Sequence, residues 1–264
     1  MKMTAPTNQL IAVAAEMALP KVRQKERLGG LESLRGYAAL SIVCFHVIWI
    51  PKLIDPNLLG FMKWYFGFGV PLFFVVSAFS LTYGYAGRFF SEQDILSFWI
   101  RRLARIAPLF YFMLVFQIAI LHFNYNQAIS ISDTILSATF TFDLVSNRVD
   151  GIVLSSWSIG VEMLFYVLFP VLLIICRNGL ATAFALLLSI LVTFKLLIGN
   201  VDNSMSHTLI YNMPYFISGI IGFYLYQFLQ QKRPKIMALL CIGVGFIGLL
   251  VLTISQQFPV NILL

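Results

Sequence analysis

Seven long apolar stretches constrain the fold of this sequence more than any other feature. A helix needs roughly 20 largely apolar residues to cross the ~30 Å hydrocarbon core of a bilayer. Hydrophobic residues make up 59% of the chain and charged residues 11%, whereas soluble domains carry about 25% charged residues. We therefore predict an all-α, polytopic bundle of transmembrane helices with about seven spans. The expected spans are residues 33–50, 61–86, 104–122, 153–176, 179–199, 208–229 and 236–255.

The positions of the basic residues predict how the spans are oriented. Of the 18 Lys and Arg residues, 13 fall on the side of the N-terminus, four fall on the other side, and Arg35 lies within the first span. The positive-inside rule then predicts a cytoplasmic N-terminal segment, residues 1–27, and an outer C-terminus. Topology thus accounts for the net charge of +7 without a nucleic-acid partner.

Segments outside the spans carry weaker signals. The apolar run at residues 10–19 is too short to span a bilayer and contains Glu16. We interpret it as a cytoplasmic surface helix, because the basic cluster behind it opposes export as a signal peptide. The longest polar connection, residues 123–152, is expected on the outer side. We also expect outer-boundary positions for His122, Trp157 and His207, with Trp157 in an aromatic belt.

The three cysteines, Cys44, Cys176 and Cys241, all lie inside apolar runs. Their spacing is not that of metal ligands, so we predict no metal site and no disulfide framework. In the second expected span, the Gly and Pro residues within 67–71 predict a kinked or broken helix beside a cavity.

Ionisable residues inside a span are costly, and this chain has few. Arg35 and His46 share a face of the first span, because eleven residues advance an α-helix by three turns plus about 20° and by about 16 Å. Glu162 is the only acid well inside a span. We expect it at a depth comparable with His46, where a carboxylate could support an imidazole during proton transfer. The alternative is that both residues are polar contacts between helices.

Three arginines stand at the cytoplasmic start of the third expected span: Arg101, Arg102 and Arg105. Guanidinium groups bind phosphate in a bidentate manner, so this cluster suits a phosphorylated ligand. The alternative is a topological role with binding of lipid head groups, and the spacing alone favours that alternative.

Four segments together resemble the motifs of the membrane acyltransferase 3 family. The first is LESLRGYAAL at residues 31–40 with His46, which resembles the Arg and His that the family separates by ten residues. The others are GVPLFFVVSAF at residues 69–79, RRLARIAP at residues 101–108, and SWSIGVE at residues 156–162 continuing to Phe165, Tyr166 and Pro170. The resemblance covers about residues 28–170, and beyond residue 170 it is one of hydropathy only.

This resemblance implies a membrane O-acyltransferase domain over residues 28–264. Such an enzyme moves an acyl group, often acetyl, from cytoplasmic acyl-CoA to a sugar hydroxyl of a surface glycan or glycolipid, with no permanent cofactor. The resemblance implies catalytic roles for Arg35, His46 and Glu162. The CoA phosphates would be held by Arg101, Arg102 and Arg105. The implied location is the cytoplasmic (inner) membrane of a bacterium, as a multi-pass protein.

The chain departs from the family pattern in two places. Pro71 stands where the family usually has an acid, and we expect seven spans where members commonly have about ten. A shortened member, an inactive fragment and a chain that needs a partner are the open alternatives. The competing functions are a non-enzymatic transporter and a structural membrane protein. A transporter should contain inverted repeats or paired broken helices, and the sequence predicts one broken helix and no repeat.

Overall fold

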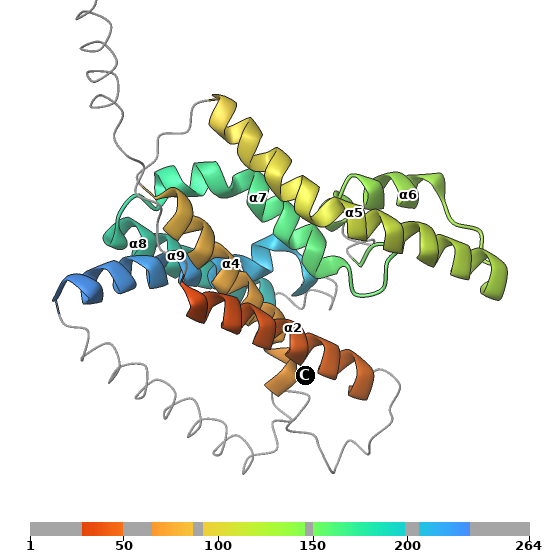
Figure 1. Ribbon diagram of the computed structural model, residues 1–264, viewed down its shortest axis with the longest axis horizontal. Helices are drawn as coiled ribbons and strands as arrows, with labels where there is room; N and C mark the ends of the chain where they lie inside the picture. The colour runs from red at the N-terminus through yellow and green to blue at the C-terminus, as the bar shows by residue number, and fades with distance from the viewer. Residues whose placement is uncertain (1–27, 50–64, 87–91, 146–149, 199–205, 233–264) are drawn as a thin grey trace, which may run out of the picture.

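The computed structural model of the protein describes residues 28–49, 65–86, 92–145, 150–198 and 206–232 (Figure 1). This part of the chain is helical and contains no strand. The helices are α2 (Gly29–Trp49), α4 (Gly69–Tyr85), α5 (Glu92–Tyr125), α6 (Ile131–Ala138), the 3₁₀ helix η1 (Phe142–Leu144), α7 (Trp157–Ile175), α8 (Gly179–Ile198) and α9 (Leu209–Lys232). The predicted all-α helix bundle is therefore confirmed.

Four helical stretches are long and apolar enough to cross a membrane, judged by length and composition: residues 65–85, 92–125, 157–175 and 179–196. Helices α2 and α9 have 21 and 24 residues, which also gives them the length to cross a bilayer core. The seventh expected span, residues 236–255, lies outside the described residues, as does the short run at 10–19. The number of spans and the orientation of the N-terminus stay predictions.

Helix α5 begins well before the span that hydropathy predicts. It starts at Glu92 rather than at residue 104, about three turns earlier. Glu92 and Asp94 lie in its first turn, where negative charge favours a helix start. The backbone therefore stays helical outside the apolar stretch. As a result, the arginine-rich segment at residues 101–105 lies inside a continuous helix instead of at its beginning.

The interruption expected in the second span is present. The backbone turns at Phe68, and α4 begins at Gly69 with Pro71 in its first turn, where a missing N–H costs no helix hydrogen bond. Gly69 also allows α4 to lie close to α2, because a Cβ at this position would meet the Ala38 carbonyl oxygen at 2.9 Å.

Stacked phenylalanine rings join the central helices. Phe165 of α7 stacks on Phe216 of α9 with ring centroids 3.9 Å apart, and Phe216 stacks on Phe74 of α4 at 4.6 Å. All three side chains are fully buried. Helix α9 also packs against α8, and α4 against α2. Gly219 of α9 permits the close approach to α4, because a Cβ there would overlap the Val75 carbonyl oxygen.

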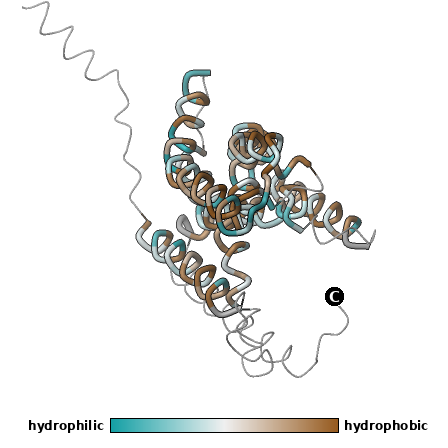
Figure 2. Tube along the Cα trace, turned by 90° about the vertical axis from the view of Figure 1, so that its right-hand side faces the viewer, coloured by the Kyte–Doolittle hydropathy of each residue, from teal (hydrophilic) through white to brown (hydrophobic). Residues whose placement is uncertain are grey.

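The outside of the bundle is strongly apolar. Figure 2 shows hydrophobic residues, in brown, recurring along the helices. The exposed large side chains include Leu109, Phe112, Val115 and Phe116 on α5 and Leu180, Phe184, Leu187 and Leu188 on α8. In water a surface of this kind promotes aggregation, whereas lipid tails are as apolar as the side chains that face them. The protein is therefore a membrane protein.

The long connection between α5 and α7 folds back onto the bundle. It contains α6 and η1, and the buried ring of Phe142 lies so close to Gly160 of α7 that a Cβ at Gly160 would clash with it. The hydroxyl of Tyr111 on α5 donates a hydrogen bond of 2.9 Å to the Ala138 carbonyl. In Figure 1, α6 accordingly lies beside the second half of α5. This connection forms one wall of the cavity that contains the candidate site.

Candidate active site

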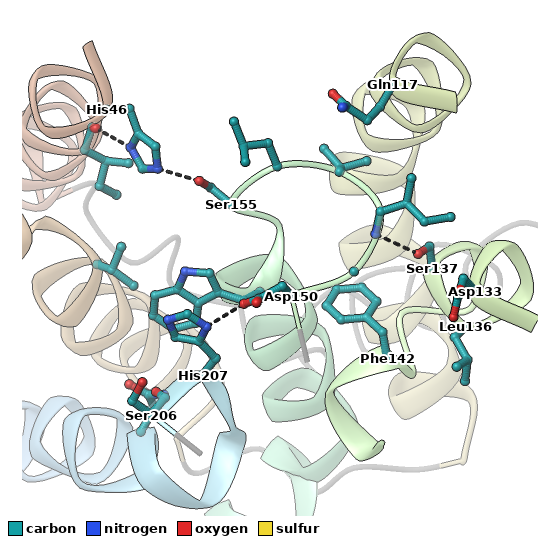
Figure 3. Close-up of a pocket in the computed structure, with 18 of the residues that line it drawn as sticks. His46, Gln117, Asp133, Leu136, Ser137, Phe142, Asp150, Ser155, Ser206 and His207 are labelled. Atoms are coloured by element: carbon teal, nitrogen blue, oxygen red, sulfur yellow. Dashed lines mark hydrogen bonds and ion pairs between the residues drawn. The ribbon is translucent and has the colours of Figure 1, made fainter. Parts of the chain in front are cut away.

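A cavity of about 1480 Å³ lies between α2, the break before α4, the second half of α5, the fold-back connection and the start of α9 (Figure 3). Ligand sites usually measure about 300–1,000 Å³, so the cavity has room for a sugar-sized ligand. Polar groups in its wall include His46, Asp133, Asp150, Ser155 and His207. Among the residues that the structure describes, no arginine lines it.

His46 lies in the last turn of α2, and both of its ring nitrogens make hydrogen bonds. Its Nδ1 is 2.7 Å from the Ile42 carbonyl oxygen, one turn earlier in the same helix, and its Nε2 is 2.6 Å from the Ser155 Oγ. A carbonyl oxygen can only accept a hydrogen bond. We therefore assign the proton of the neutral ring to Nδ1. The Nε2 atom then accepts a hydrogen bond from the Ser155 hydroxyl (Figure 3).

Ser155 occupies a tight turn just before α7. Its φ angle is +63°, a left-handed conformation that non-glycine residues rarely adopt. The turn is fixed by its neighbours, because Ser156 donates its backbone N–H to the Val153 carbonyl at 3.0 Å and its hydroxyl to the Asp150 carbonyl at 3.0 Å. No sequence pattern marked Ser155 separately, apart from its place beside the Trp-Ser motif.

A second histidine lies in the same cavity. The Nδ1 of His207 is 2.5 Å from the Asp150 Oδ1, and the imidazole ring stacks on the indole of Trp157 with centroids 4.3 Å apart and planes inclined by 11°. Both Trp157 and His207 line the cavity. The outer-boundary position expected for these two residues stays a prediction, and the structure adds that both face the cavity. The fold-back connection and the start of α9 enclose them.

Glu162 does not pair with His46. It is buried on α7, and its Oε1 accepts hydrogen bonds from the Ser77 hydroxyl of α4 at 2.7 Å and from the Tyr166 hydroxyl. Helix α4 packs against both α2 and α7, and its Ser77 takes one of the hydrogen bonds of the carboxylate. The carboxylate thus joins α4 to α7, which matches the alternative of a polar contact between helices.

The arginines divide into two groups. Arg35 interacts electrostatically with Arg102, Arg105 and Glu162. The guanidinium of Arg102 lies over two aromatic rings, at 5.6 Å from the Phe98 centroid and 5.7 Å from the Tyr166 centroid.

Arg101 instead turns toward the Tyr85 hydroxyl, to which its Nη2 donates at 3.4 Å. The three arginines of the sequence motif therefore do not all face one ligand position. Arg35, which shares a helix face with His46 at about 16 Å along the axis, interacts with Arg102 and Arg105. We call the set of Arg35, Arg102 and Arg105 the arginine cluster.

Two buried donors of the arginine cluster have no hydrogen-bond acceptor among the described residues: the Nε atoms of Arg35 and Arg102. A buried donor without an acceptor costs about 1–3 kcal/mol. Such donors are therefore expected where an anionic ligand completes the site. In contrast, no group of three or more His, Cys, Asp or Glu residues in the described part could hold a metal ion.

Asp143, in η1, connects the fold-back connection to α9. Its Oδ2 accepts a hydrogen bond of 3.1 Å from the Leu209 N–H. Burial raises the pKa of this carboxyl to about 6, and the Leu209 N–H partly opposes the shift. Its Oδ1 is buried without a partner among the described residues. Asp143 thus supports the cavity wall without lining the cavity.

The fold and the site define a helical membrane protein with a histidine-centred cavity and a cluster of arginines, two of which are half-buried. The chain belongs to the membrane acyltransferase 3 family, because the family profile described as an acyltransferase domain matches residues 28–263. The expected family is thereby confirmed.

The chain is also similar to O-acetyltransferase OatA of Staphylococcus aureus. It is 28% identical over 170 residues to the protein of strain NCTC 8325 / PS 47, and equally to that of strain COL. The matched region covers 59% of this chain and 26% of each relative. The matched part is therefore about a quarter of the length of these relatives. No solved structure matches the chain significantly.

Proposed function

We propose that this protein is a membrane-embedded O-acyltransferase that moves an acyl group, such as acetyl, from cytoplasmic acyl-CoA to a hydroxyl of a carbohydrate outside the membrane. The acceptor would be a surface glycan or glycolipid of a bacterial cell envelope, and the protein would lie in the cytoplasmic membrane. Family membership supports the reaction class. The name O-acetyltransferase of the relatives supports a hydroxyl acceptor and an acetyl group.

The observation that carries the proposal is the state of His46. The Ile42 carbonyl holds the Nδ1 proton, so the basic Nε2 is directed at a hydroxyl 2.6 Å away in the cavity wall. A hydroxyl becomes an effective nucleophile when a positioned base takes its proton, an effect of about 10²–10⁴-fold. This geometry supports the proposal that His46 activates the hydroxyl that accepts the acyl group.

The arginine cluster is the proposed donor site. CoA carries several phosphate groups, and guanidinium groups bind phosphate through paired hydrogen bonds. The unpartnered Nε atoms of Arg35 and Arg102 offer such donors. Arg35 precedes His46 by eleven residues on α2, a rise of about 16 Å. A long, thin arm such as that of CoA could span this distance and deliver the thioester near His46.

The proposed acceptor site is the part of the cavity between His46 and His207. Trp157 with its stacked His207 offers a flat aromatic wall, and the Asp150 carboxylate adds a strong hydrogen-bond acceptor. A few placed polar groups against apolar rings are typical of small-ligand sites. We assign no acceptor sugar, because these groups would suit many polyols.

The test is an acyl-transfer assay on the protein in lipid nanodiscs, with acetyl-CoA as donor and a panel of hexose and N-acetylhexosamine glycans as acceptors. We expect His46→Ala to lower transfer by about 10²–10⁴-fold while acetyl-CoA binding is kept. The matched control is His122→Ala, since His122 is exposed near the end of α5 and does not line the cavity. Equal transfer by the His46→Ala variant and the wild type would refute the proposal.

A further inference from the structure

The basic nitrogen of His46 is already engaged by a hydroxyl of the protein itself. The Ser155 Oγ lies 2.6 Å from Nε2, and the lone pair of that nitrogen accepts one proton at a time. An acceptor sugar can use His46 only after Ser155 has left this position. Ser155 is therefore the first hydroxyl that the histidine can activate.

We propose that Ser155 is the nucleophile of the reaction and carries the acyl group as an ester between the donor and the acceptor. This inference rests on the proposed acyltransferase function and deepens it. A serine whose hydroxyl is hydrogen-bonded to an oriented imidazole is the arrangement that activates serine in acyl-transfer enzymes. Here the Ile42 carbonyl is the group that orients the ring.

The backbone at Ser155 supports a role beyond packing. A left-handed φ at a non-glycine residue is strained and persists only where the surroundings impose it. The hydrogen bonds of Ser156 impose it here, together with Gly151, whose φ is +67°. A nucleophilic serine on a strained turn that leads into a helix is also the arrangement of the nucleophile elbow.

The position of Ser155 relative to α7 favours the chemistry as well. The helix begins at Trp157, two residues after the serine. The N-terminal end of a helix favours negative charge. The oxyanion that forms when an alkoxide attacks a carbonyl develops such charge, and preorganised dipoles near it lower the barrier.

A covalent carrier also solves a problem of geometry. The arginine cluster is about 16 Å from His46 along α2, and the proposed acceptor arrives from the opposite side of the membrane. With an acyl-serine, CoA can leave before the acceptor enters. The two substrates then never need to occupy the cavity together.

Both steps balance. First, the Ser155 Oγ gives its proton to the His46 Nε2 and forms a bond to the thioester carbonyl carbon. The carbon–sulfur bond breaks, and the CoA sulfur leaves as a thiol with that proton. Second, the acceptor hydroxyl gives its proton to Nε2 and attacks the serine ester. The bond to Oγ breaks, and Ser155 regains the proton.

The experiment traps the acyl-enzyme. The full chain in nanodiscs is incubated with labelled acetyl-CoA without acceptor, quenched in acid, and analysed by peptide mass spectrometry. We expect one acetyl group on the peptide that contains Ser155. Ser155→Gly should carry none, and glycine accepts the positive φ of the turn without strain. The Ser155→Cys variant should carry the acetyl group as a thioester, which neutral hydroxylamine releases and which does not form on the glycine variant.

The matched control is Ser189→Ala, because Ser189 lies on α8 away from the cavity and bonds only within its helix. It should acylate like the wild type. If Ser155→Gly transfers acetyl to acceptors at the wild-type rate and no adduct forms, Ser155 is not the carrier, while the acyltransferase function stands. If the wild type neither forms the adduct nor releases CoA thiol in a manner that depends on His46, both the carrier and the proposed function are wrong.

Discussion

The arginine cluster and the His46 cavity stand near opposite ends of α2, and they are built in different ways. The cluster is set by regular helices: Arg102 lies on α5 over the rings of Phe98 and Tyr166, and Arg35 faces it from α2. The cavity depends on irregular backbone, because Ser155, at a φ of +63°, and Asp150 both belong to the fold-back connection. Regular helical spacing thus positions the arginines, whereas loop backbone shapes one wall of the cavity.

The first prediction concerns which side of the membrane each of these two regions faces. The expected difference in thiol labelling is all or none. In a chain whose native cysteines are replaced by Ala, Asn124→Cys at the end of α5 should react with an impermeant thiol reagent added to intact cells. Gln93→Cys at the start of α5 should not react until the cells are opened. The positive-inside rule is the reason. The reverse labelling pattern would exchange the proposed donor and acceptor sides.

The second prediction separates the arginines. Arg102→Ala should weaken acetyl-CoA binding by about tenfold or more, because a charge-assisted hydrogen bond contributes roughly 1.5–3 kcal/mol. Arg102→Lys should recover only part of the affinity, since lysine lacks the planar fork. Arg101→Ala should weaken binding less, because Arg101 faces Tyr85.

Calorimetry of the variants in nanodiscs measures these affinities. An equal loss for Arg101→Ala and Arg102→Ala would mean that Arg101 acts on the donor as Arg102 does, despite its contact with Tyr85. No loss for either variant would leave the arginines with a topological role only.

The third prediction tests whether Glu162 acts on His46 or on the helix packing. Glu162→Gln should lower the free energy of unfolding by roughly 1–3 kcal/mol, because two hydrogen bonds lose their charged acceptor. Its effect on stability should couple to that of Tyr166→Phe in a double-mutant cycle. The stability effects of Glu162→Gln and His46→Ala should add within about 0.5 kcal/mol, as expected for residues that do not contact each other.

Thermal unfolding of the purified variants supplies the free energies for both cycles. Strong coupling between Glu162→Gln and His46→Ala would contradict this prediction and support the carboxylate–imidazole pair that the sequence suggested. Transfer should fall less in Glu162→Gln than in His46→Ala.

The last prediction concerns the cavity wall. The pKa of Asp143 is raised to about 6 from an ordinary value of 3.8. The folded protein therefore binds this proton more tightly than the unfolded chain does. This contribution to stability is present below the ordinary pKa and is lost as the pH rises to about 6. Asp143→Asn should therefore raise the melting temperature at pH 7 and remove this part of the pH dependence.

Melting curves between pH 4 and pH 7 test the prediction, with Asp94→Asn on the exposed first turn of α5 as the control. The free energy of unfolding at pH 7 should rise by at most about 2–3 kcal/mol, the amount that the raised pKa implies. The asparagine oxygen can still accept the hydrogen bond from the Leu209 N–H. A melting temperature that falls at pH 7 would show that the charged carboxylate stabilises the wall.

Much of the bundle could be predicted because hydropathy is a local property. The apolar stretches within the described residues become helices, and the break at residues 67–71 becomes the turn at Phe68. The family could be predicted because its motifs lie within single helices. The start of α5 could not be predicted from hydropathy, because acidic first-turn residues extend a helix without adding apolar character.

The sequence by itself determined that Arg35 and His46 share a face of one helix, because the 3.6-residue repeat is built into the helix. Only the tertiary structure decided their partners. It brought Ser155 to His46 across 109 positions of sequence and Ser77 to Glu162 across 85. It also directed His207, at the start of the last described helix, into the cavity beside Asp150. Hydrogen bonds of this kind depend on how separate helices and a fold-back connection pack, and no local periodicity contains that information.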